Sequence, residues 1–147
     1  GALAGAKPGP LVRELPAEAE ANPTDPADLH ALRITAKRLR YAIELFADCF
    51  PPSLKEAMYP AVERVQEILG EVQDANVGVA RLTDILNRAE YALPQTFGRV
   101  REEIDALISN LQQKIPAGRE LFSGWRGEWL ELVAATRFEA LTAVVTA

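Results

Sequence analysis

Prolines divide this chain into long segments in which apolar residues recur every three or four positions. This spacing predicts amphipathic helices, because residues three and four apart lie on one face of a helix. Asp25-Pro26 is a typical helix start, whereas Pro51-Pro52 and Pro116 are expected to stop the first and third helices. The predicted helices cover roughly residues 26–50, 53–91, 94–116 and 118–145, and the residues expected to face the core include Leu107 of the third helix and Leu121 of the fourth.

Four such helices with short connections predict an all-α fold, an antiparallel four-helix bundle with long helices over residues 25–147. Residues 1–24 contain four prolines among glycine and alanine, so we expect a flexible N-terminal arm or linker there. Pro60 is expected to break or kink the second helix early. Gly70 and Gly78 are poor helix formers within the same segment.

The composition excludes several classes of protein. The chain is 48% hydrophobic and 25% charged, as is typical of globular proteins. No run approaches the roughly 18 apolar residues of a membrane-spanning helix, and the N-terminus does not resemble a secretion signal. Cys49 is the single cysteine and cannot form a disulfide within the chain. We therefore expect a cytoplasmic protein that makes no contact with a membrane.

Motifs of catalysis and metal binding are missing from the sequence. It contains no glycine-rich phosphate loop, no His-Glu-x-x-His helix and no Gly-x-Ser-x-Gly turn. One histidine and one cysteine cannot build a metal site rich in these residues. We therefore expect no catalytic residues, no cofactor and no metal, which argues against a phosphohydrolase.

One short segment concentrates positive charge. Between His30 and Tyr41 there are four Lys or Arg residues and no acidic residue, whereas the other 12 basic residues face 21 acidic ones. On a helix that turns about 100° per residue, one face about 100° wide contains five residues of this segment: His30, Arg33, Lys37, Arg40 and Tyr41. We call these five residues the basic stripe. Leu32, Leu39, Ile43 and Phe46 occupy a separate, apolar face of the same helix, which we expect to be buried.

The basic stripe is suited to binding a linear polyanion. It extends about 16 Å along one rigid helix, where Arg presents a planar fork to phosphate oxygens and Lys adds a mobile charge. The net charge of −5, taken alone, argues against a polyanionic partner. The acidic remainder of the surface would instead confine a polyanion to the stripe. A solvated basic face without a ligand is the alternative interpretation, and Arg38 lies off the stripe.

A second candidate surface lies on the last predicted helix. Arg119, Arg126 and Arg137 fall on one face beside Trp125 and Trp129. These arginines could line the same cleft as the basic stripe. The alternative is that their methylene stems cover the aromatic rings and their charges lie in solvent.

The residues of the first helix also resemble a known family. The sequence HALRITAKRLRYAIELF over residues 30–46 resembles the signature helix of the CHAD family, the conserved histidine α-helical domain. The sequence LGEVQDANV over residues 69–77 is similar to its second motif, and Trp125-Arg126 is similar to the pattern of its last helix. The resemblance covers about residues 28–140.

The resemblance implies a helical, non-catalytic module that binds inorganic polyphosphate or another phosphate-rich polyanion and associates with polyphosphate granules. The family usually has two four-helix repeats, whereas this chain resembles only the second. We therefore expect either a missing second repeat or a homodimer. The resemblance implies ligand contacts by His30, Arg33, Lys37, Arg38 and Arg40, with additional contacts expected from Tyr41, Arg119 and Arg126.

Two other uses of the stripe stay open. The first is a structural or adaptor bundle that uses the stripe for an acidic protein partner or for self-association. The second is nucleic-acid binding, which ranks below polyphosphate because only Tyr41 offers a nearby stacking ring and amides that read bases are absent from this face.

The stripe predicts that polyanion binding depends on pH. His30 near a helix N-terminus gains a favourable charge partner when an anion binds, so affinity is expected to rise as the pH falls from 8 to 6, through the range in which histidine takes up a proton. Binding titrations across this range, with His30→Gln as the comparison, measure the effect. A flat profile in the unaltered protein would show that His30 is not the proton-linked contact.

Overall fold

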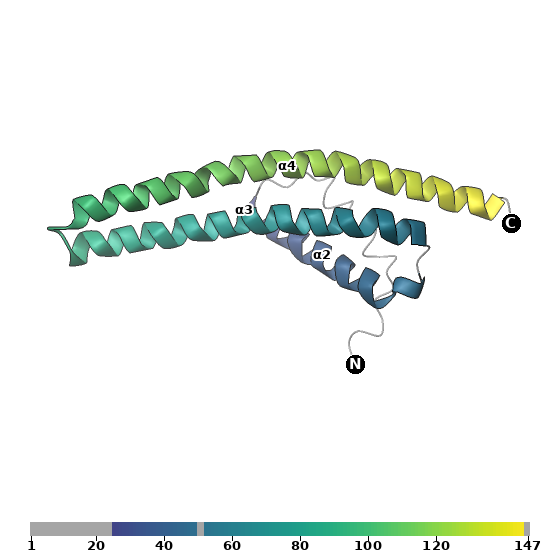
Figure 1. The fold of residues 1–147 in the computed structure, drawn as a ribbon, viewed down its shortest axis with the longest axis horizontal. Coiled ribbons are helices and arrows are strands. Elements are labelled where there is room, and N and C mark those ends of the chain that lie inside the picture. Colours follow the sequence, from purple (N-terminus) through teal and green to yellow (C-terminus); the bar gives the residue numbers. More distant parts are fainter. Residues whose placement is uncertain (1–24, 50–51, 146–147) are drawn as a thin grey trace. The chain divides into compact units, whose positions relative to one another are not determined.

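The structure is a computed structural model, and it describes residues 25–49 and 52–145. Side chains are described up to residue 136, except those of residues 49, 53 and 54. Within this part of the chain the elements are α-helices and one 3-10 helix, without a strand, so the all-α class is confirmed. In chain order they are α2 (Pro26–Leu45), η1 (Ala47–Cys49), α3 (Pro52–Ala92) and α4 (Phe97–Val145) (Figure 1).

The predicted division into four helices is wrong, because the third and fourth predicted helices form the single 49-residue α4 with Pro116 inside it. A proline inside a helix costs about 3 kcal/mol. Burial of each large apolar side chain stabilises by roughly 1.5–3 kcal/mol, and α4 has buried residues on both sides of the proline, among them Ile104 and Phe122. Tertiary packing therefore keeps α4 continuous across Pro116. Pro60 likewise lies inside the 41-residue α3 and does not break it.

The helix ends match the sequence at some points and not at others. Asp25 caps α2 as predicted, since its carboxylate accepts a hydrogen bond from the backbone N–H of Ala27 at 3.1 Å. The helix then ends at Leu45, before the predicted end at residue 50, and η1 follows. The predicted flexible arm, residues 1–24, lies outside the described residues.

The chain divides into two compact units. Among the described residues, the first holds α2, η1, α3 up to Leu69 and α4 from Leu121 onward, and we call it the three-helix unit. The second spans residues 70–120, with the rest of α3, the connecting turn and the start of α4, and we call it the hairpin unit. No helix in the described part of the chain has a stretch long and apolar enough to cross a membrane.

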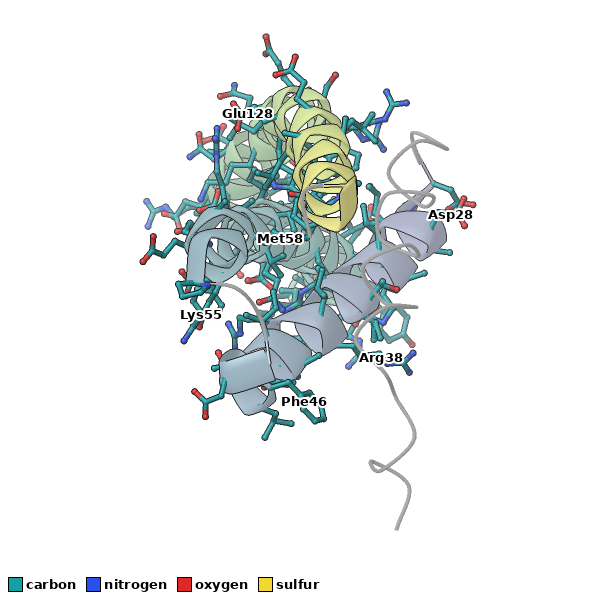
Figure 2. The ribbon with its side chains drawn as sticks, turned by 90° about the vertical axis from the view of Figure 1, so that its right-hand side faces the viewer. Asp28, Arg38, Phe46, Lys55, Met58 and Glu128 are labelled. Carbon is teal, nitrogen blue, oxygen red and sulfur yellow. The ribbon has the colours of Figure 1, made fainter. Side chains whose placement is uncertain are left out.

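The core of the three-helix unit is built around two tryptophans of α4. Trp125 and Trp129 are almost completely buried and stack with ring centroids 5.5 Å apart. The indole N–H of Trp125 donates a hydrogen bond to the backbone carbonyl of Ala61 at 2.7 Å, which ties α4 to α3. Met58 lies between the three helices in Figure 2. Other buried residues of this core are Leu29, Leu32, Ala36, Leu39, Ile43, Val62, Val65, Ile68, Leu69, Phe122 and Val133.

Three residues that the helical spacing assigned to the core are exposed instead. They are Phe46, Leu107 and Leu121, with exposed fractions of 37%, 52% and 50%. Phe46 follows the last residue of α2, where the helix that would turn it inward has ended. The prediction is therefore wrong at these three positions, of which Leu107 lies in the middle of the predicted third helix.

The hairpin unit packs α3 against α4 with fewer large side chains. Val72 and Ala75 of α3 and Ile104 of α4 are buried. Gly78 lets the helices approach closely, because a Cβ atom placed there would lie 2.7 Å from Cδ1 of Leu111. Gly70 has open space around the corresponding position.

The two glycines of α3 should respond differently to the same substitution. Gly70→Ala is expected to raise the free energy of unfolding by about 0.5–1 kcal/mol, because alanine favours helix and meets no neighbour. Gly78→Ala should gain less or destabilise the protein, because Leu111 must move. Chemical denaturation of both variants measures this difference. Equal effects, or a loss of stability in Gly70→Ala, would contradict this packing.

Candidate functional site

The burial of α2 determines where its polar side chains lie. Leu32, Leu39 and Ile43 are buried and fix one face of α2 against the rest of the three-helix unit. Arg33 and Arg40 are half-buried at the margin of that face, and Lys37 between them is exposed. The cations of the predicted stripe are therefore held at the edge of the core.

A groove runs between α2 and α3 within the three-helix unit. Its volume is about 590 Å³. We call it the α2–α3 groove. The α2 side contributes a cationic wall with one aromatic ring, and the α3 side contributes two carboxylates and an amide. Its lining residues are Arg33, Lys37, Arg40, Tyr41, Glu63, Gln66 and Glu67.

The cations on the α2 wall differ in how they are held. The Tyr41 ring contacts both neighbouring cations, with Lys37 Nζ 5.8 Å and Arg40 Cζ 5.2 Å from its centroid. Such cation–π contacts fix the two positive groups over one ring. Within the described residues, neither Arg33 nor Lys37 forms an ion pair. Their charges are thus available to a ligand.

Glu44 connects the end of the α2 wall to α3. Its Oε1 lies 3.5 Å from Nε of Arg40, and the two residues form an ion pair across one turn of α2. The same oxygen accepts a hydrogen bond from the hydroxyl of Tyr59 on α3 at 2.6 Å. The buried Nε of Arg40 has no hydrogen-bond partner in the described residues, so Glu44 positions this guanidinium by charge rather than by a hydrogen bond.

The acidic wall on α3 was not anticipated from the sequence. Glu63 and Glu67 are exposed, one helical turn apart, and Gln66 lies half-buried between them. The Oε1 atom of Gln66 is buried without a hydrogen-bond partner among the described groups. The signal was present, since residues 63 and 67 flank the apolar stripe of α3, but the sequence alone did not show which helix face would meet the basic stripe.

Two residues expected to contact a ligand lie outside this groove. His30 is exposed one helical turn before Arg33, and it does not line the groove. Arg38 is also exposed, and in Figure 2 its side chain points away from the ribbons of α3 and α4. The structure therefore brings together Arg33, Lys37, Arg40 and Tyr41, with His30 and Arg38 elsewhere on α2.

Arg119 and Arg126 of α4 are not among the described residues that line the groove. Arg126 is half-buried in the three-helix unit, and Arg119 is exposed in the hairpin unit. Both make interactions with other residues. The side chain of Arg137 lies outside the described residues.

Comparison with known proteins identifies the family. The sequence profile of the CHAD domain matches residues 3–83, which is more than half of the chain. The chain therefore belongs to the CHAD domain family. The matched region holds all of α2 and the α3 residues that line the groove. No curated protein and no solved structure shows significant similarity to the chain.

The described residues hold no group of three or more His, Cys, Asp or Glu side chains that could bind a metal ion. The polar groups gathered in the groove are cations, carboxylates and an amide. Such a set can attract and orient an anion along the α2 wall.

The contact between Glu44 and Tyr59 has a measurable electrostatic consequence. The hydrogen bond to Glu44, then partial burial and the negative charges of Glu44 and Glu63, raise the pKa of Tyr59 above 10.0, while Arg40 opposes the rise. Because the folded-state pKa is raised, this hydrogen bond stabilises the fold below the ordinary tyrosine range. The stabilisation is lost as the pH rises through the raised value.

Replacing Glu44 tests this arrangement. Glu44→Gln is expected to lower the pKa of Tyr59, because it removes a negative charge beside the hydroxyl. Ultraviolet titration of tyrosinate measures the shift, Tyr59→Phe identifies the transition among the three tyrosines, and Glu56→Gln serves as a charge-matched control. An unchanged Tyr59 transition in Glu44→Gln would show that the contact does not form in solution.

Proposed function

We propose that this chain is a non-catalytic module that binds inorganic polyphosphate, or another phosphate-rich polyanion, along the α2 wall of the α2–α3 groove. The observation that carries the proposal is the alignment of Arg33, Lys37 and Arg40 along one groove, with Arg33 and Lys37 free of ion pairs among the described residues. Membership of the CHAD family supports the same ligand class.

The spacing of these cations suits a chain of phosphates. Residues 33, 37 and 40 follow one another at successive helical turns, which spaces them over about 10 Å along the axis. Like charges at this spacing destabilise a helix by roughly 0.2–0.5 kcal/mol per pair, and an anion lying along them relieves the repulsion. Arg33 and Arg40 would bind phosphate oxygens through their planar forks, and Lys37 would add a point charge.

The remaining expected contacts have different places in this proposal. His30 extends the wall toward the N-terminus of α2, where backbone N–H groups also favour an anion. Tyr41 positions Lys37 and Arg40 through its ring. Arg38 faces away from the groove, so we expect it to contribute least. Arg119 and Arg126 remain secondary candidates for a long ligand.

The setting of the module is also a proposal. A protein of this kind would lie in the cytoplasm, at polyphosphate granules. A second repeat or a second copy of the chain would extend the surface available to a long polymer. We propose no cofactor and no catalytic residue.

An adaptor function is the second candidate. Ile34, Tyr41 and Leu45 are exposed on α2 at intervals of seven and four residues, with exposed fractions of 39%, 43% and 70%. This apolar strip beside the cations would suit an acidic amphipathic helix of a protein partner or of a second copy.

A titration with long-chain polyphosphate tests the main proposal. Replacing Arg33, Lys37 and Arg40 together with Ala is expected to weaken binding by at least about tenfold, because charged hydrogen bonds contribute roughly 1.5–3 kcal/mol each. The dependence of log affinity on log salt should become shallower by about 2, as three phosphate contacts disappear.

A charge-matched control separates this site from general electrostatics. Ala at Arg38, Lys55 and Arg81 removes three positive charges from positions that do not line the groove, and it should weaken binding much less. Equal losses in the two triple variants would contradict the groove. No binding by the unaltered protein would contradict the proposal and favour the adaptor.

A further inference from the structure

The α2–α3 groove carries charges of both signs on opposite sides. Arg33, Lys37 and Arg40 lie on the α2 side, and Glu63 and Glu67 lie on the α3 side. In the described residues no ion pair within 4.0 Å links a carboxylate of α3 to a cation of α2. The charges on the two sides are therefore not neutralised by direct contact. The positive charges of α2 and the negative charges of α3 both act on a ligand that enters the groove.

The register of α3 fixes the two carboxylates on this side. Val62 and Val65 are completely buried, which turns the neighbouring positions outward. Arg64 faces α4 instead, where its Nη1 lies 2.9 Å from Oε2 of Glu128. Glu63 and Glu67 are left to face α2, without a partner of opposite charge within ion-pair distance among the described residues.

We infer that Glu63 and Glu67 are specificity-determining residues that restrict the groove to narrow, unbranched phosphate chains and disfavour wider polyanions. The inference rests on the proposed function. A polyphosphate chain has directly linked phosphates without attached groups, so it can follow the α2 wall and stay away from α3. In single-stranded nucleic acid each phosphate is joined to a sugar that carries a base, so the strand needs more width.

Electrostatics then separates the two ligands. Phosphates of a wider strand that fills the groove approach the carboxylates, and like charges brought together oppose binding and exclude wrong partners. A nucleic-acid strand also makes fewer contacts with the cations per unit length, because sugars separate its phosphates. The carboxylates therefore weaken the binding of nucleic acid more than that of polyphosphate.

The experiment compares two ligands and two proteins. Glu63→Gln/Glu67→Gln keeps the size of both side chains and removes their charges. Affinities are measured for long-chain polyphosphate and for single-stranded DNA at one salt concentration. The double variant is expected to bind polyphosphate no more than about threefold tighter and DNA about tenfold tighter or more, since the removed repulsion acts mainly on the wider ligand.

Two controls make the outcome specific. Glu56→Gln/Glu131→Gln removes two exposed negative charges that do not line the groove, and it should change both affinities equally and slightly. Glu63→Gln alone should lower the pKa of Tyr59, because the charge of Glu63 contributes to raising it. This second readout requires no ligand.

The results distinguish this inference from the proposed function. Equal gains for both ligands, or no gain for DNA, would overturn the specificity role while polyphosphate binding by the unaltered protein stands. Failure of the proposed function appears separately, as polyphosphate binding that is absent or that survives replacement of Arg33, Lys37 and Arg40.

Discussion

Packing of the apolar face of α2 in the three-helix unit is the interaction on which the rest of this structure depends. Leu32 and Leu39 are completely buried in the core that contains Trp125 and Trp129. This burial fixes the rotation of α2 about its own axis. Arg33 and Arg40 follow the buried leucines by one residue, so the same contacts that hold the core place both guanidinium groups at the margin facing α3.

The resulting groove differs from a uniformly basic surface, because carboxylates of α3 lie across from the cations of α2. Arg40 is positioned by Glu44 and by the Tyr41 ring, and Glu44 is itself held by Tyr59. A guanidinium held in this way loses less conformational entropy when it binds an anion. In the proposed function, the carboxylates across the groove would limit the space in which that anion is favoured. The held cations and the repelling carboxylates would together confine a polyanion to this groove in a chain whose net charge is −5.

The sequence was sufficient to predict the elements with strong local signals. The Asp25 cap, the long second helix and the buried residues at 32, 39 and 43 followed from capping chemistry and helical spacing. The continuity of α4 through Pro116 was not predictable in this way, because burial on both sides of the proline outweighs its local cost. The same reason explains the continuity of α3 through Pro60.

Only the α2 side of the candidate site could be predicted from the sequence. The cations of α2 lie on one helix, so their spacing alone showed that they share a face. Glu63, Gln66 and Glu67 belong to another helix, and no local pattern specifies which of its faces meets α2. That face is set by long-range packing, of which the hydrogen bond from Trp125 to Ala61 is one part.

The central claim is that the anion lies along the α2 wall of the groove. Titration of isotopically labelled protein with polyphosphate, followed through the NMR signals of the arginine Nε–H groups, tests it residue by residue. The account predicts that the signals of Arg33 and Arg40 shift together and saturate, while Arg38 and Arg64 change little. Shifts concentrated at Arg38, or at arginines of the hairpin unit with Arg33 and Arg40 unchanged, would contradict it.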